Sequence, residues 1–138
     1  MSSQPRTVRA MIDSSPAQID LDHDLLAEVL EAAQACAQAC TACADACLSE
    51  DGVADLAKCI RTDLDCADIC SMVSRVLSRH TAYDAAVTRA VLEACAVACR
   101  SCADECERHA EMHEHCRVCA EACRRCEQAC ARLLNTIS

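Results

Sequence analysis

The chain has 138 residues, which is enough for one domain with a single core. Its formal net charge of −9 argues against nucleic-acid binding, and it lacks the run of about 20 apolar residues that a membrane span needs. Sixteen cysteines would be typical of a secreted disulfide scaffold, but a single glycine, two prolines and abundant helix formers argue against such a loop-rich fold.

Residues 1–17 are predicted to form a flexible N-terminal tail ahead of a domain that covers residues 18–138. This segment contains Pro5, Ser14, Ser15 and Pro16 and has no sustained apolar period. Its basic residues are not followed by the apolar stretch of an export signal. We therefore expect a cytoplasmic protein, in which thiols stay reduced and clustered cysteines indicate metal binding.

The first two helices are predicted from apolar and cysteine residues that recur at steps of three and four. The first helix runs from about Ile19 to Ser49, and its stripe consists of Leu26, Val29, Ala33, Cys36, Cys40, Cys43 and Cys47. Gly52, the only glycine, marks the turn that follows. The stripe of the second helix consists of Leu56, Cys59, Cys66, Cys70, Val73 and Leu77.

The third helix is expected to begin near His80–Asp84, where Thr81 and Asp84 have the spacing of a loose capping box. Its stripe consists of Thr88, Leu92, Cys95, Cys99, Cys102 and Cys106, and that of the fourth helix consists of Cys116, Cys119, Cys123, Cys126, Cys130, Leu133 and Ile137. We place a turn near His109–Met112. One continuous helix is the alternative, because no glycine or proline interrupts residues 107–115, but helices average only about 11–12 residues.

These four stripes predict an all-α fold, an antiparallel up-down-up-down four-helix bundle with a cysteine-lined core. In that topology, hydrocarbon side chains gather at one end, which we call the closed end. They are Leu26, Val29, Val73, Leu77, Leu92, Leu133 and Ile137. The opposite, open end gathers Cys47, Cys59, Cys106 and Cys116 with three histidines. Metal is therefore expected to enter at the open end.

A repeated C-x3-C-x2-C-x3-C pattern supplies the candidate metal ligands. It occurs at residues 36–47, 95–106 and 119–130, and a degraded copy at residues 59–70 has Asp63 in the second cysteine position. Residues three and four apart share one face of a helix, so each copy is a ladder of sulfurs. The candidate ligands are Cys36, Cys40, Cys43, Cys47, Cys59, Cys66, Cys70, Cys95, Cys99, Cys102, Cys106, Cys116, Cys119, Cys123, Cys126 and Cys130.

Cu(I) suits such ladders because it is soft and accepts two or three sulfur ligands. One monovalent ion per bridging thiolate also leaves the core neutral, whereas tetrahedral zinc sites with four thiolates are negatively charged. Three alternatives stay open at this point. The thiols could bind zinc or mixed metals, form disulfides, although pairs along one helix align badly for them, or act only as small apolar side chains.

Three histidines near the predicted turn, His109, His113 and His115, are candidate ligands at the point of metal entry or exit; a solvated turn is the alternative. Asp63 is a further candidate in the metal site. Because a carboxylate is a poor ligand for a soft ion, the alternatives are that it supports the ligands or lies on the helix surface. Met72 and Met112 offer thioether sulfurs but are expected in the core or on the surface. His23 and His80 fall near the closed end and receive no functional role.

Over residues 19–137 the chain resembles the bacterial four-helix-bundle copper storage proteins, in the cytosolic branch that lacks an export signal. The resemblance rests on the repeated cysteine ladders and on the His109-x3-His113-x-His115 cluster. It implies a homotetramer of bundles, each storing many Cu(I) ions in its core with histidines at the mouth. A copper chaperone that loads or empties the store is a further expected partner. Leu25, Leu30, Ile60 and Leu64 are available for an oligomer interface.

The sequence favours a binding protein over an enzyme. It contains no Ser/His/Asp set, phosphate loop or paired catalytic carboxylates. A thiol redox enzyme or sensor would need an exposed cysteine of low pKa, usually in a C-x2-C motif at a helix N-terminus. The C-x2-C pairs here fall mostly in mid-helix, within longer ladders. A purely structural role for the cysteines is the third hypothesis.

Overall fold

The computed structural model describes residues 4–137, and within that range the regular structure is entirely helical. The elements are α1 (Gln4–Ser14), α2 (His23–Leu48), the short 3-10 helix η1 (Val53–Leu56), α3 (Ala57–Val76), α4 (Ala85–Glu107) and α5 (Glu114–Leu134). None of these helices combines the length and the hydropathy that crossing a lipid bilayer requires.

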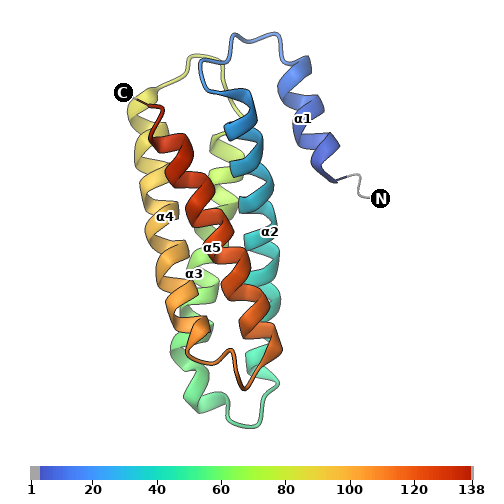
Figure 1. The fold of residues 1–138 in the computed structure, drawn as a ribbon, viewed down its shortest axis with the longest axis vertical. Coiled ribbons are helices and arrows are strands. Elements are labelled where there is room, and N and C mark those ends of the chain that lie inside the picture. The colour runs from blue at the N-terminus through green and yellow to red at the C-terminus, as the bar shows by residue number, and fades with distance from the viewer. Residues whose placement is uncertain (1–3, 138) are drawn as a thin grey trace.

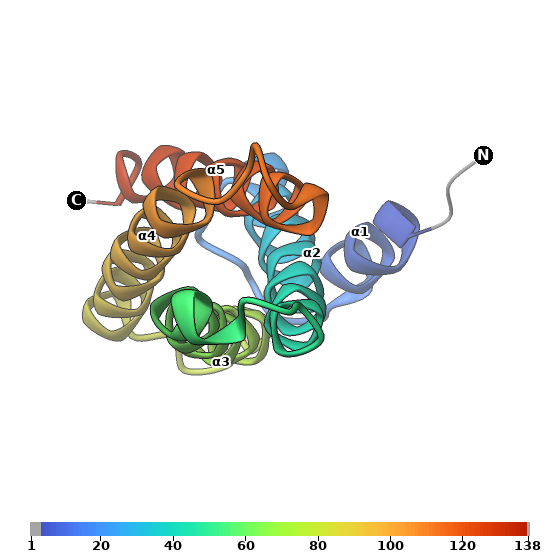
Figure 2. The same cartoon turned by 90° about the horizontal axis from the view of Figure 1, so that it is seen from below.

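Helices α2 to α5 form the predicted antiparallel four-helix bundle. Helix α2 packs against α3 and α5, and α4 packs against the same two helices. Figure 1 shows the four helices running up and down in turn, and Figure 2 shows them as the corners of a square around a common core. The predicted fold class is confirmed.

The connection between α4 and α5 is a turn, as expected. Helix α4 ends at Glu107 and α5 begins at Glu114, so the chain reverses direction over residues 108–113. The backbone N–H of His113 donates to the carbonyl of His109 over 3.0 Å, which closes the turn. The alternative of one continuous helix is therefore wrong.

Asp84 is the N-cap of α4, and its side chain accepts hydrogen bonds from the backbone N–H groups of Ala86 and Val87. The predicted capping box with Thr81 is wrong, because Asp84 occupies the cap position itself rather than the third helical position. Asp22 caps α2 in the same way, through the N–H of Leu25. Both caps lie at the closed end of the bundle (Figure 1).

Helix α1 lies outside the bundle, against α2 (Figure 2). Val8 and Ile12 are buried, and Arg9 pairs with Asp24. Pro5 falls in the first turn, where a missing N–H costs nothing. The helix Gln4–Ser14 was not among the helices predicted from the sequence. The flexibility of this segment and the domain boundary at residue 18 stay predictions.

The closed end is filled with hydrocarbon as expected. Its fully buried side chains are Leu26, Val29, Val73, Leu77, Leu92 and Leu133. Ile137 packs partly buried against them. Because burying each such side chain stabilises the fold by roughly 1.5–3 kcal/mol, this end carries much of the stability that a cysteine core lacks.

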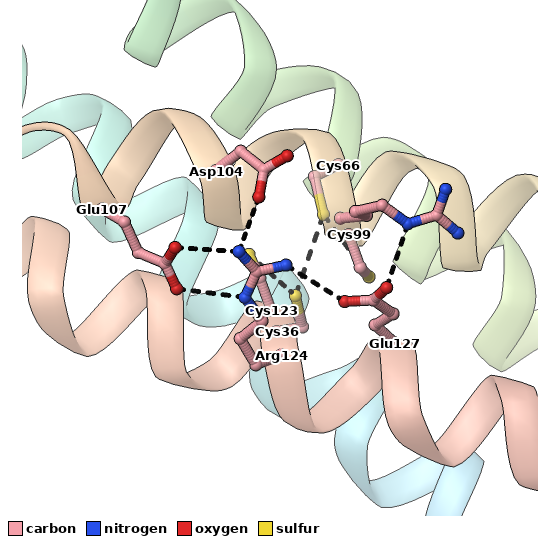
Figure 3. Close-up of polar contacts among 9 residues, drawn as sticks. Cys36, Cys66, Cys99, Asp104, Glu107, Cys123, Arg124 and Glu127 are labelled. Atoms are coloured by element: carbon pink, nitrogen blue, oxygen red, sulfur yellow. Dashed lines mark hydrogen bonds and ion pairs between the residues drawn. The ribbon is translucent and has the colours of Figure 1, made fainter.

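An ion-pair cluster joins α4 to α5 on the outside of the bundle. Arg124 of α5 pairs with Asp104 (2.6 Å) and Glu107 (2.8 Å) of α4, and Glu127 pairs with Arg100 (3.0 Å). Figure 3 shows this cluster on the outer surface with cysteine sulfurs behind it, between the helices. The charges therefore stay in water while the sulfurs fill the core.

Candidate metal centre

All sixteen cysteines are free thiols and all are buried. The predicted ladders therefore face the core on all four bundle helices. A redox enzyme would need an exposed thiol, and none of these cysteines provides one. The disulfide alternative has no bonded pair to support it, and many sulfurs lie close to several others rather than to a single partner.

The sulfurs form a continuous network along the bundle axis. Within one helix, the Sγ atoms of Cys36 and Cys40 are 3.8 Å apart. Between helices, the Sγ atom of Cys40 is 3.6 Å from those of both Cys119 and Cys123. Further along, Cys66 lies 3.8 Å from Cys99. At these separations one metal ion can be held between neighbouring sulfurs without moving the helices.

The sulfurs also fall into groups of four whose atoms all lie within 4.8 Å of one another. Five of these groups are Cys36/Cys66/Cys70/Cys99, Cys36/Cys40/Cys66/Cys123, Cys40/Cys102/Cys119/Cys123, Cys43/Cys47/Cys59/Cys116 and Cys70/Cys95/Cys99/Cys126. Several cysteines belong to two groups. Shared ligands favour clusters of bridging thiolates over separate tetrahedral zinc sites, each of which would need four ligands of its own.

Near the open end, burial favours the protonated form of two unligated cysteines, Cys47 and Cys116. For Cys47, near the open end, burial and the neighbouring Cys43 raise the pKa to about 11. Burial likewise raises the pKa of Cys116, with Cys43 and Cys47 adding to the effect. A thiolate forms in such surroundings only when a cation arrives to balance it. Metal uptake and proton release are therefore coupled.

Asp63 lies inside the thiol network. Its Oδ1 atom accepts from the Sγ atoms of Cys102 (3.1 Å), Cys119 (3.3 Å) and Cys106 (3.4 Å), and its buried Oδ2 atom has no partner. Burial and the neighbouring sulfur of Cys102 raise the pKa of this carboxyl to about 9, so it is protonated at neutral pH. The alternative position on the helix surface is wrong. Whether Asp63 binds metal stays a prediction.

His115 connects the open end to the sulfurs. Its Nδ1 atom lies 3.4 Å from the Sγ atom of Cys43 and 3.6 Å from that of Cys116, while its Nε2 atom lies 2.9 Å from Glu50. Burial lowers the pKa of His115, but Cys43 and Glu50 outweigh burial and raise it overall. One imidazole therefore faces the solvent-side carboxylate with one nitrogen and the core with the other.

The other two histidines also lie at the open end, each beside a carboxylate. His113 Nδ1 is 3.2 Å from Glu50, and His109 Nε2 is 3.1 Å from Glu105, which is buried. The rings of His113 and His115 are stacked, with centroids 5.4 Å apart. The predicted histidine cluster is therefore together in space, although only His115 contacts a cysteine.

Sequence reasoning missed the two carboxylates. Glu105 and His109 are four residues apart on one helix, a spacing that could have identified the pair. Glu50 gave no such signal, because the fold alone brings it to the histidines. Met72 is half-buried and Met112 is 80% exposed, so neither packs in the core.

Comparison with known proteins relates the chain to one family and to several solved structures. The family model described as copper storage protein matches residues 22–135. Among solved structures, the copper storage protein Ccsp from Streptomyces lividans, loaded with 10 copper equivalents, is 64% identical with a TM-score of 0.92, and the match covers 93% of this chain and 98% of that one. A structure of copper loading to a cytosolic copper storage protein from the same organism is 68% identical, with a TM-score of 0.82 and coverage of 83% and 96%.

A more distant relative has the same fold. Apo copper storage protein 3 from Bacillus subtilis is 33% identical over 77% of this chain and 95% of that one, with a TM-score of 0.66. No curated protein matches the chain. The family model covers every cysteine ladder and all three histidines of the open end, and the chain belongs to the copper storage protein family.

Proposed function

We propose that this protein is a cytosolic store for Cu(I), which binds many ions in its thiol core, limits free copper and buffers copper supply. The observation that carries the proposal is the set of overlapping four-sulfur groups, which extends through all four helices. The Streptomyces relatives, described as a cytosolic protein and as loaded with 10 copper equivalents, support it. The family stores copper rather than catalysing a reaction, so the chain is not an enzyme.

The core suits a neutral cluster of many ions. Each thiol loses its proton as a Cu(I) ion binds, and each bridging thiolate balances one positive charge. A core filled in this way carries no uncompensated charge, which low-dielectric surroundings would penalise heavily. A divalent zinc ion needs two thiolates to balance its charge but four ligands to complete its tetrahedral site. If each zinc ion had only the two thiolates that balance it, too few sulfurs would be left to complete the sites.

Entry is proposed at the open end, where His115 reaches Cys43 and Cys116. The closed end is filled by leucine and valine and offers no soft ligand to an ion. His109 and His113 would capture ions at the mouth, and the sixteen cysteines would hold them. Asp63 contacts three thiols and would therefore change how the ions are bound at its level of the core.

An anaerobic Cu(I) titration of the reduced protein against a chromogenic chelator tests the proposal. The expected result is a capacity of many ions per chain, and saturation at only a few ions would contradict storage. In a matched pair, replacing the α2 ladder (Cys36, Cys40, Cys43 and Cys47) with alanine should remove a large part of the capacity. Thr88→Val, at a buried core position of α4 without a thiol, should leave it unchanged.

We also propose a homotetramer, supported by exposed apolar side chains on α3 and α4. Leu64 of α3 is 47% exposed. Val97 of α4 is 54% exposed and lines, with Ile69, a groove between the two helices. Leu30, in contrast, is already covered within the chain, beside α1. Analytical ultracentrifugation tests the assembly: a tetramer is expected, with weaker association for Val97→Lys, and a monomer at all concentrations would contradict it.

A copper chaperone is the proposed donor or acceptor at the open end, because that is where histidine reaches the sulfurs. The test is anaerobic transfer of Cu(I) from a purified chaperone, compared with transfer from a Cu(I)–thiol complex of similar affinity. Faster transfer from the chaperone supports a docking step. Equal rates would mean that this protein takes its copper from the exchangeable pool.

A further inference from the structure

One carboxylate joins the two connections that border the open end. The Oε2 atom of Glu50 lies 2.9 Å from His115 Nε2 and 3.2 Å from His113 Nδ1. Glu50 follows α2, whereas the histidines lie at the start of α5. Helices α2 and α5 are neighbours in the bundle (Figure 2), so Glu50 links the end of one to the start of the other.

The position of Glu50 is fixed by the end of α2. Its backbone N–H donates to the carbonyl of Cys47 over 3.2 Å, and the N–H of Ser49 donates to the carbonyl of Ala46 over 3.0 Å. A carboxylate acceptor is thus held one turn beyond a core cysteine.

This acceptor determines how His115 presents its two nitrogens. A carboxylate accepts hydrogen bonds only, so the Nε2 atom of His115 carries the hydrogen and donates it to Glu50. In the neutral ring the lone pair is then on Nδ1, which faces the Sγ atom of Cys43 over 3.4 Å. That lone pair is the one that binds a metal ion.

His113 supports this arrangement independently, because its contacts with Glu50 and His115 replace a helix cap that would stabilise α5. It is the N-cap of α5, yet its side chain makes no capping hydrogen bond. Serine, threonine, asparagine or aspartate at this position would contribute about 1 kcal/mol. The ring instead contacts Glu50 and stacks on His115 at an interplanar angle of 19°. Such a departure from the local rule is expected at functional sites.

We propose that Glu50 is a positioning residue for Cu(I) entry. It holds His115 with Nδ1 aimed at Cys43 and holds His113 stacked beside that ring, so an ion captured at the mouth passes to the first core thiol without a ring rotation. The proposal rests on the proposed storage function, and it concerns the rate of loading rather than the capacity of the store.

The test compares Glu50→Ala and Glu50→Gln with Asp51→Asn, a change at the exposed neighbour in the same connection. Uptake of Cu(I) from a chromogenic complex is followed by stopped flow, and capacity is measured at equilibrium. Glu50→Ala should load roughly ten-fold more slowly with unchanged capacity. Glu50→Gln should be intermediate, because the amide oxygen still accepts from Nε2–H, and Asp51→Asn should load at the native rate.

A spectroscopic readout separates positioning from a general structural effect. In the 15N spectrum of the apo protein at mildly alkaline pH, His115 should be in the Nε2–H form, and Glu50→Ala should convert it to a mixture of tautomers. If Glu50→Ala does not fold, Glu50→Gln against Asp51→Asn decides.

Three outcomes overturn the positioning role: loading of Glu50→Ala at the native rate, an unchanged His115 tautomer in Glu50→Ala, or a reduced capacity in either Glu50 variant. The last would make Glu50 a ligand. Failure of the wild type to bind many ions would instead contradict the storage function itself, so the two proposals fail separately.

Discussion

The two ends of the bundle follow different rules. At the closed end, leucine and valine fill the core, and Asp84 caps the adjoining helix with its side chain. At the open end, histidines contact carboxylates, and a histidine occupies a cap position without capping. Buried hydrocarbon is concentrated at the closed end, which leaves the open end free to give up local stability for the ligand geometry that we propose there.

The largest expected effect is at the closed end. Leu92→Ala, at a fully buried position, should lower the free energy of unfolding of the apo protein by about 4 kcal/mol, through lost burial and the cavity left behind. Val87→Ala, on the exposed face of the same helix, should change it by less than about 0.5 kcal/mol. Urea unfolding followed by circular dichroism measures both.

The difference between the two ends also predicts the rate and the capacity with which Leu92→Ala loads Cu(I). Below its unfolding transition this variant should load Cu(I) at the native rate and to the native capacity. Slower loading in the folded variant would show that the closed end takes part in copper entry, and the division between the two ends would not hold.

Asp63→Asn should raise the free energy of unfolding, whereas Leu92→Ala lowers it. The folded protein keeps the Asp63 proton up to a pKa of about 9, whereas an unfolded chain releases it near pH 4. Retaining this proton therefore costs stability, and the cost grows as the pH rises from about 4 to about 9. The variant removes the cost and should be more stable at pH 7 by about 2 kcal/mol, less than the full shift because its new N–H2 lacks an acceptor.

The pH dependence is the check on Asp63→Asn. Unfolding by urea at a series of pH values should show the gain over the wild type shrinking as the pH is lowered toward 4. A gain of the same size at every pH would come from packing and would contradict a protonated buried carboxyl.

The bundle and its thiol core could be predicted because both follow from spacing along single helices. Three-and-four steps place Cys36 and Cys40 on one face whatever the partner helix is, and the alternation of direction then sorts Leu92 to one end and Cys106 to the other. A turn near His109–Met112 was predicted because one continuous helix would far exceed the usual length, and the structure has the turn at residues 108–113.

The remaining features depend on contacts between distant segments. Helix α1 was missed because its apolar face is a single short cluster, Val8 with Ile12, whose burial needs α2. Glu50 was missed because residues 50 and 115 are far apart in sequence and neither position carries a periodic signal. Asp63 was found as a gap in a ladder, but its three thiol contacts come from other helices.

A smaller effect is expected at the helix caps. Asp84→Ala removes the acceptor for the N–H groups of Ala86 and Val87 and should lower the free energy of unfolding by about 1 kcal/mol. Asp84→Ser, which keeps an oxygen at the cap, is the control and should lose only a small part of this. An unchanged stability in Asp84→Ala would mean that the closed end does not depend on its caps.

The smallest effect, and the one most specific to the comparison, is expected for His113→Ser. Serine can cap α5, as His113 does not, but the variant also loses the contact with Glu50, so the net gain in the free energy of unfolding should be only about 0.5 kcal/mol. Copper loading, measured by stopped flow, should slow at the same time. If a helix cap has been given up for ligand geometry, this one substitution should raise the stability and lower the loading rate. If the variant is less stable and loads at the native rate, then His113 is at the cap position for packing alone, and the open end follows the same rules as the closed one.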